Sequence, residues 1–379
     1  MSIFFLVLII IAPFVSVPLI LFGAIYEGKK HPIIYSILLS VPFALLAYNY
    51  IPDVSKDLYR YYVEMKYIYE GMDLTGYFGV MFGNTKILFN TIQFIFTKIG
   101  NYNLLPVTIT FIGYSISFYM ILDYMKICNC KRKYVALMLI LFICVFYHIN
   151  FISGLAQYFA ISMSFLAFYL EYVKKKKGKI YKILYVLPCL IHITMVMALF
   201  FRILMSFKFE KIKKVYLAIL IIYLIIPNVF LIFVNDNYLL AEKIKTYMVN
   251  GDRLLSSTYE IAMAVLFFII FTFFIKTKKK VLDITSDKFI DLGYIFMLFN
   301  LFSIRYEDIF LRFFNYSFLY MILYLAIYLE KVETKNKKYI VSFILLICII
   351  FGSVNINNFK AMEFKKDFLI RNMFYIMEK

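Results

Sequence analysis

The sequence predicts an all-α, polytopic integral membrane protein, and two observations carry that prediction. Of the 379 residues, 63% are hydrophobic and the mean hydropathy is +0.81, whereas a soluble domain is about half apolar. The apolar residues also form repeated runs of about twenty, the length that a helix needs to cross a bilayer. We therefore expect about 10–12 transmembrane helices.

The positive charge of the chain supports the same class. The formal net charge is +18, and most of the lysines stand in short clusters between apolar runs. Cytoplasmic loops of membrane proteins carry such clusters, so the charge indicates topology and not nucleic-acid binding. The clusters expected on the inner side are 27–31, 126–133, 174–179, 276–280 and 331–338.

Ten apolar runs are expected to cross the membrane. The first has no basic residue before it and is apolar for too long to be a cleaved signal peptide, so it is expected to be a retained span. Both ends of the chain are then outside. The ten runs are 3–25, 33–51, 104–125, 134–150, 152–173, 214–234, 257–275, 289–304, 308–329 and 338–354.

Two further apolar stretches, 84–99 and 180–205, leave the topology open. If neither stretch crosses the membrane, all five basic clusters lie on the inner side. If both cross, residues 100–179 are placed on the opposite side of the membrane and the rest of the topology is unchanged. The first stretch is short and carries Lys86 and Lys98, which suits an interfacial or re-entrant segment. The second contains Pro188, which can break a helix.

The chain is expected to form a single transmembrane domain over residues 1–379, with outer loops near 52–83 and 235–256. No soluble catalytic domain, internal repeat or phosphate-binding loop is evident. The five cysteines are scattered, and we expect no disulfide framework and no metal site.

The outer loop after the second span begins with an unusual density of ionisable groups. Residues 51–65 read IPDVSKDLYRYYVEM, in which Asp53, Asp57, Arg60 and Glu64 recur at spacings of three and four. That spacing places the four on one face of a helix. They form either a solvated row of salt bridges or a site where a carboxylate acts as base and Arg60 binds an anion. The tyrosines at 59, 61 and 62 are expected to anchor the segment at headgroup depth.

A second charged group surrounds the expected outer turn near residue 305. Arg305 and Arg312 are seven residues apart, with Glu307 and Asp308 between them. Arg312 lies a turn inside its span, where a charge costs about 2.5 to 3.5 kcal/mol. The group is either an ion network that fixes the turn or a pair of guanidinium forks for phosphate oxygens.

Two isolated residues complete the candidates from spacing and position. His192 stands near Pro188 and Thr194, where it is either a helix–helix hydrogen-bonding residue or a functional group. Arg253, in the outer loop 235–256, is a candidate contact for an anionic headgroup.

Four short motifs in this order resemble the EpsG-like, Wzy-type polymerases of bacterial surface polysaccharide. They are D-x-x-x-D-L-x-R-Y-Y at 53–62, Q-x-x-A from Gln157, His-x-Thr from His192, and R-x-x-x-Y from Arg312 to Tyr316. The family pattern favours an arginine before the glutamine, where this chain has Ala156. The role of that arginine is then expected to belong to another residue, and Arg253 is one candidate.

The resemblance implies an enzyme of the bacterial cytoplasmic membrane with its active site facing outside. Such a polymerase transfers an oligosaccharide from undecaprenyl diphosphate to a sugar hydroxyl of the next lipid-linked repeat unit, without a metal or cofactor. Asp57 or His192 is the expected base, and Arg60, Arg305 and Arg312 are expected to neutralise the diphosphate, with Arg253 as a further candidate. Asp53, Gln157 and Tyr316 are candidate substrate contacts. A flippase and a chain-length regulator are the candidate protein partners.

Other membrane functions remain open at this point. An O-antigen ligase or another lipid-linked glycosyltransferase shares the chemistry, although a ligase predicts a larger outer loop than 235–256. A membrane acyltransferase predicts arginine and histidine near the inner leaflet, and a polysaccharide transporter predicts two related halves.

Overall fold

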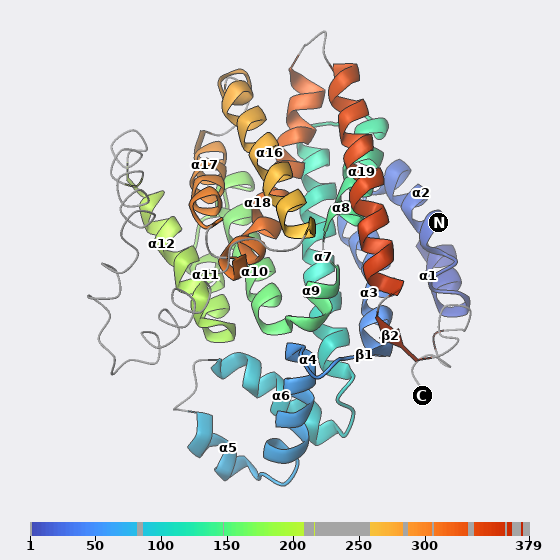
Figure 1. Ribbon diagram of the computed structural model, residues 1–379, viewed down its shortest axis with the longest axis vertical. Coiled ribbons are helices and arrows are strands. Elements are labelled where there is room, and N and C mark those ends of the chain that lie inside the picture. The colour runs from blue at the N-terminus through green and yellow to red at the C-terminus, as the bar shows by residue number, and fades with distance from the viewer. Residues whose placement is uncertain are drawn as a thin grey trace. The chain divides into compact units, whose positions relative to one another are not determined.

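The computed structural model describes residues 2–81, 86–146, 148–207, 216, 258–282, 287–304, 307–332, 337–360, 362–365 and 373. These residues are almost entirely helical, which confirms the prediction of an all-α polytopic membrane protein (Figure 1). Four described helices are long and apolar enough to cross a membrane: Pro32–Asn49, Leu104–Ile127, Ile309–Lys331 and Lys337–Lys360. Shorter apolar helices accompany them.

The chain forms two compact units. The first contains Met1–Ala167, Lys182–Thr194 and Leu325–Lys379, and the second contains Phe168–Tyr181 and Met195–Tyr324. The segment 214–234, the outer loop near 235–256 and Arg253 within it lie outside the described residues, apart from Tyr216.

The helices of the N-terminal half are, in order, α1 (Ser2–Ile11), α2 (Val17–Glu27), α3 (Pro32–Asn49), α4 (Asp57–Glu64), α5 (Leu74–Met81), α6 (Ile87–Ile99), α7 (Leu104–Ile127), α8 (Arg132–Val145), α9 (His148–Ser153) and α10 (Leu155–Phe168), with the π-helices η1 (Met65–Tyr69) and η2 (Tyr169–Val173).

Those that follow are α11 (Lys179–Ile191), the 3₁₀-helix η3 (Ile193–Met195), α12 (Val196–Leu204), α16 (Thr258–Leu282), α17 (Asp287–Phe302), α18 (Glu307–Lys331) and α19 (Lys337–Lys360), and two short strands are β1 (Tyr50–Ile51) and β2 (Glu363–Phe364).

The predicted first span, 3–25, is wrong as a single helix, because it is divided into α1 and α2. Proline lacks a backbone N–H and disfavours helical conformation in the residue before it, and Pro13 stands two residues after the end of α1. The intervening turn is closed by the Ser16 hydroxyl, which donates to the Pro13 carbonyl at 2.8 Å.

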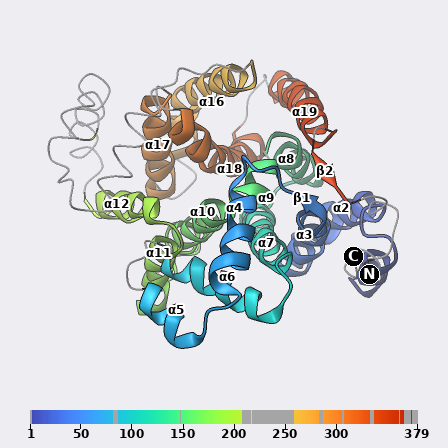
Figure 2. The ribbon, with the colours of Figure 1, turned by 60° about the horizontal axis from the view of Figure 1, so that its bottom comes forward.

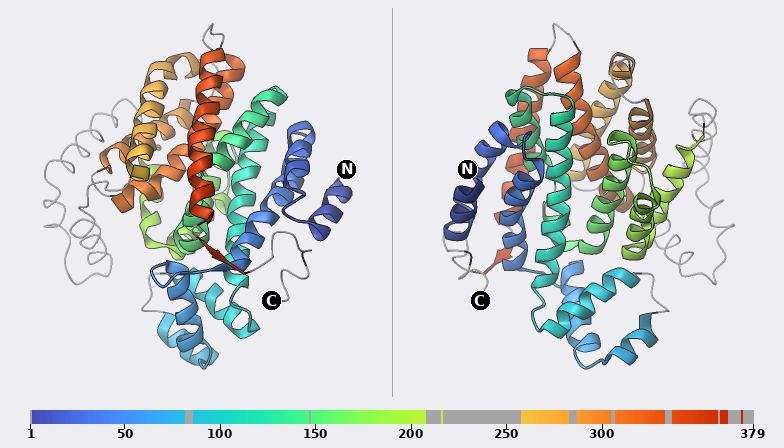
Figure 3. Two further views of the ribbon diagram at one scale, coloured as in Figure 1. Left: turned by 45° about the vertical axis from the view of Figure 1, so that its right-hand side comes forward. Right: turned by 180° about the vertical axis from the view of Figure 1, so that it is seen from behind.

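The core of the first unit is the packing of α3 along α7, with α8 packed against α19 (Figure 3). Phe43 of α3 stacks on Tyr114 of α7, with ring centroids 4.4 Å apart and planes inclined by 6°. The adjacent Gly113 of α7 permits the Phe151 ring of α9 to approach the α7 backbone closely, since a Cβ at Gly113 would lie 2.0 Å from that ring. Large buried aromatic surfaces therefore fix these helices together.

The first unit also contains a two-stranded ladder, β1 with β2, that was not predicted. Tyr50 pairs with Phe364 and Ile51 with Glu363 in an antiparallel ladder, and the Lys365 N–H donates to the Asn49 carbonyl at 3.0 Å. The chain after α19 is thereby attached to the end of α3. The ladder immediately precedes the turn that leads into α4.

The second unit is also held by aromatic contacts. Phe296 of α17 meets Phe168 and Phe201 edge-on, with centroid distances of 5.5 and 4.8 Å. Gly293 of α17 lies directly against Tyr320 of α18, where a Cβ would come within 1.9 Å of the ring. The Arg202 guanidinium donates to Glu171 at 3.2 Å.

Candidate functional site

Helix α4 begins at Asp57, and the turn before it is held by Asp53. The Asp53 carboxylate accepts the Ser55 N–H at 2.8 Å, an arrangement typical of aspartate in turns. This bond lowers the pKa of Asp53, so the carboxylate stays ionised and keeps its acceptor role at neutral pH. The prediction that Asp53 shares a helical face with the other three charged residues is wrong, because Asp53 precedes the helix.

Asp57 and Arg60 form an ion pair one turn apart on α4. The side chains are 37% and 69% exposed, respectively. An exposed pair of this kind contributes about 0–1 kcal/mol to stability. Arginine has five N–H donors, so Arg60 can bind an anion while it contacts Asp57. The structure therefore brings together two of the predicted site residues and leaves both accessible.

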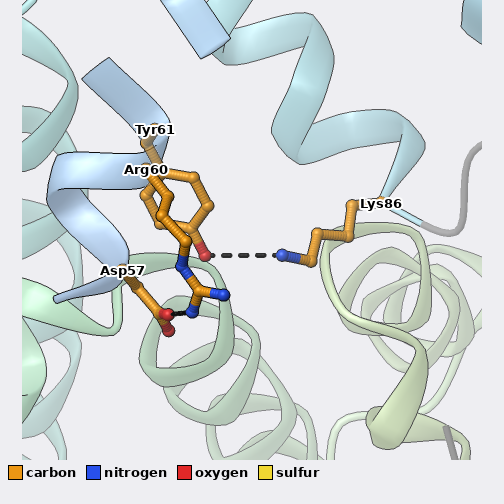
Figure 4. Close-up of polar contacts among 4 residues, drawn as sticks. All are labelled: Asp57, Arg60, Tyr61 and Lys86. Carbon is orange, nitrogen blue, oxygen red and sulfur yellow. Dashed lines mark hydrogen bonds and ion pairs between the residues drawn. The ribbon is translucent and has the colours of Figure 1, made fainter. Parts of the chain in front are cut away.

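Lys86 is the residue before α6, and its side chain reaches Tyr61 of α4. Its Nζ donates to the Tyr61 hydroxyl at 3.4 Å and lies 5.2 Å from the centre of the Tyr61 ring. Figure 4 shows the lysine reaching toward the helix that carries Asp57 and Arg60. Lys86 is a second cation in the candidate site. Sequence reasoning noted Lys86 only as a charge in a short apolar stretch.

Polar contacts hold α4 against the neighbouring segments, whose ribbons Figure 2 shows with α5 and α6 toward the viewer. Gln93 of α6 donates to the Glu64 carboxylate at 3.1 Å, and the Tyr62 hydroxyl donates to Asn103 at 2.8 Å. Burial raises the pKa of Tyr62, so its hydroxyl remains a donor. Tyr61 is 5% exposed. The prediction that Tyr61 anchors the chain in the headgroups is therefore wrong, because its ring is buried against protein; for the exposed Tyr59 and the partly exposed Tyr62 it stays a prediction.

Helix α4 also contacts α9, which begins with the buried residue His148. The Nε2 atom of His148 lies 2.7 Å from the Ile143 carbonyl, which can only accept, so Nε2 carries the hydrogen. Nδ1 then accepts the hydrogen bond from the Tyr114 hydroxyl. The imidazole thus joins α7 to the break between α8 and α9. Asn355 of α19 donates to the Cys144 and Phe146 carbonyls at the same break, at 2.7 and 3.1 Å.

His148→Ala is expected to lower the thermal unfolding temperature of the purified protein. The change removes a stacked ring and two hydrogen bonds, and an unsatisfied buried group alone costs about 1–3 kcal/mol. Thermal unfolding in detergent, followed by size-exclusion chromatography, measures the effect. His31→Ala is the matched control, because His31 is exposed. Equal unfolding temperatures for the two variants would contradict the role of His148.

His192 and Gln157 occupy buried positions in the first unit. Pro188 lies inside α11, and the helix ends three residues later at Ile191; the N–H of the next residue, His192, donates to the Pro188 carbonyl at 2.8 Å. The predicted break is therefore at His192. Its Nδ1 lies 2.7 Å from the Thr194 hydroxyl. Gln157 is in the first turn of α10.

The remaining predicted residues lie in the second unit or outside the described chain. Arg312 and Tyr316 are on α18, and Arg312 is in the second turn, as expected; the side chains of both lie outside the described residues. Arg305 also lies outside them. No geometry therefore relates these residues to Asp57 and Arg60.

The chemistry available on α4 is that of a carboxylate paired with Arg60, with Lys86 in contact with the next residue, Tyr61. Among the residues that the structure describes, no group of three His, Cys, Asp or Glu side chains could hold a metal ion. Asp57 can accept a proton, and Arg60 and Lys86 can compensate negative charge on a ligand.

Comparison with known proteins identifies a family for nearly the whole chain. The model of the EpsG family matches residues 32–367, which include all four motifs noted in the sequence. No curated protein and no solved structure matches the chain. The match confirms the resemblance to EpsG-like proteins, and the chain belongs to the EpsG family.

Proposed function

We propose that this protein polymerises lipid-diphosphate-linked oligosaccharide repeat units into a bacterial surface polysaccharide. Membership in the EpsG family supports a polysaccharide-related role in a membrane. The proposed reaction transfers the growing chain from undecaprenyl diphosphate to a hydroxyl of the next repeat unit. The proposed location is the outer face of the cytoplasmic membrane, where a flippase would deliver the units and a chain-length regulator would act on the product.

Each bond change in this reaction has a candidate residue on or near α4. Asp57 would take the proton of the acceptor hydroxyl, whose oxygen attacks the anomeric carbon of the donor sugar. The bond from that carbon to the diphosphate oxygen breaks, and the diphosphate leaves with the electron pair. Arg60 and Lys86 would neutralise its growing negative charge.

The observation that carries the proposal is the ion pair of Asp57 with Arg60 at an accessible surface, with Lys86 opposite. The carboxylate is about one-third exposed, so an acceptor hydroxyl can reach it. His192 is a weaker candidate for the base, since its imidazole is buried and its Nδ1 already contacts Thr194. We therefore assign the proton transfer to Asp57.

Deletion of the gene tests the proposed function. Loss of a polymerase leaves the synthesis of repeat units intact, so single units should accumulate on lipid or at the surface while the long-chain ladder disappears. Gel analysis of the surface polysaccharide, with complementation by the intact gene, measures this. An unchanged ladder in the deletion strain would exclude the polymerase.

The orientation of α4 is tested by labelling an introduced cysteine. Ser55 is exposed beside α4, so Ser55→Cys should react with a membrane-impermeant maleimide in intact cells. The matched control is Lys176→Cys, in the basic loop expected inside, which should react only after permeabilisation. Labelling of the unsubstituted chain is subtracted. The reverse pattern would place α4 on the inner side and contradict the mechanism.

A further inference from the structure

The polarity of α6 is reversed relative to that of a helix surrounded by water. Its inward face buries three polar side chains, Asn90, Gln93 and Thr97, beside Phe89 and Phe94. Its outward face is a continuous apolar row at the spacing i, i+4, i+7, i+11, formed by Leu88, Ile92, Ile95 and Ile99. A helix on a water-exposed loop has the opposite arrangement.

The outward row is exposed and uncovered by the described chain. Ile95 is 50% exposed and Ile99 is 59% exposed, and Leu88 and Ile92 are partly exposed. Leu74 and Phe78, one turn apart on the neighbouring α5, are also exposed. Exposed apolar side chains thus extend over several turns of α5 and α6, which marks a membrane or protein contact.

The inward face of α6 is attached along its whole length to α4, η1 and α5, where Tyr77 lies. Phe89 contacts Tyr61 with ring centroids 4.8 Å apart, and Phe94 stacks on Tyr77 at 4.4 Å. Lys98 Nζ, near the last turn, donates to the Glu70 carbonyl at 2.9 Å. Helix α6 therefore cannot separate from α4, η1 and α5 to enter the bilayer by itself.

The length and direction of α6 also argue against a membrane crossing. Thirteen residues of α-helix extend about 20 Å, whereas the hydrocarbon core of a bilayer is about 30 Å thick. Figures 1 and 3 show α6 running across the end of α7 instead of alongside it.

We infer that α6 lies flat in the membrane interface, with Leu88, Ile92, Ile95 and Ile99 against the acyl chains of the adjacent leaflet. An amphipathic helix in this position buries its apolar face about 5–10 Å into the boundary between headgroups and acyl chains. The inference goes beyond the proposed reaction and does not depend on it. It resolves the open topology of residues 84–99 in favour of a segment that does not cross.

Tryptophan fluorescence provides the test, because the chain contains no tryptophan. Four separate variants, Leu88→Trp, Ile92→Trp, Ile95→Trp and Ile99→Trp, are reconstituted as full chains in vesicles that contain lipids with a nitroxide at a shallow or a deep position. We expect all four to lose more fluorescence with the shallow nitroxide, and to the same extent. Ile349→Trp, exposed near the middle of α19, should be quenched most by the deep nitroxide. Lys176→Trp, in an exposed basic loop, should not be quenched by either.

Two outcomes would overturn the inference. A depth that changes steadily from residue 88 to residue 99, by about 16 Å over eleven residues, would show that α6 crosses the membrane. Absence of quenching at all four positions would show that protein, such as a second copy of this chain, or water covers the row. Neither outcome affects the polysaccharide ladder, so failure of this inference is distinct from failure of the proposed function.

Discussion

Asp57→Asn is expected to slow polymerisation by about a hundredfold to ten-thousandfold, the usual contribution of a general base. Asparagine preserves the size of the side chain but cannot take the proton of the acceptor hydroxyl. The protein should remain abundant in the membrane, since the ion pair that is lost with Arg60 is exposed. The measurement is the polymerisation rate with purified lipid-linked repeat units, normalised to the amount of protein.

Two comparisons separate a base from a structural carboxylate. Asp73→Asn is the matched control, because the Asp73 carboxylate is exposed and only accepts the Gly76 N–H at the start of α5, at 2.7 Å. Its rate should be close to that of the unsubstituted protein. Asp57→Asn should also remove the acidic limb of the pH–rate profile, which reports ionisation of the base. A normal rate for Asp57→Asn, together with a large loss for His192→Gln, would transfer the role to His192.

Arg312→Lys is expected to reduce polymerisation by about a hundredfold to a thousandfold if Arg312 binds the departing diphosphate. Lysine keeps the positive charge but lacks the planar pair of donors that contacts two oxygens at once. If Arg312 only forms an ion pair, lysine should largely replace it, whereas alanine should mainly impair folding. Chain length and rate for Arg312→Lys and Arg312→Ala, normalised to membrane abundance, distinguish these cases.

Arg202→Lys is the matched control for this experiment. Arg202 belongs to the same unit as Arg312, is partly buried and has a carboxylate partner in Glu171 at 3.2 Å. Lysine should preserve that ion pair and the rate. Long chains at the normal rate from Arg312→Ala at normal abundance would remove Arg312 from the site.

The hydropathy and charge pattern predicted the helical membrane class because both properties are local in sequence. A run of apolar residues is visible without any neighbour. Helices α3, α7 and α18 begin and end within two residues of the predicted limits, whereas α19 ends six residues later than predicted, at Lys360. The helix breaks were less predictable. The break after Val145 is organised by His148 and Asn355, which are far apart in sequence, whereas the break at Pro13 has a local cause that the continuous hydropathy concealed.

The pairing of Asp57 with Arg60 was predictable for the same reason, since one helical turn joins them. The sequence by itself therefore determined the class, the main helices and the charged face of α4, and its motifs indicated the family. Only the tertiary structure decided that Lys86 contacts Tyr61, 25 residues earlier in the chain, and that Glu64 accepts a hydrogen bond from Gln93. It also decided that α6 buries Asn90, Gln93 and Thr97. These contacts depend on how α4 and α6 pack together, and the spacing of residues along one helix carries no information about the side chains that another helix brings to it.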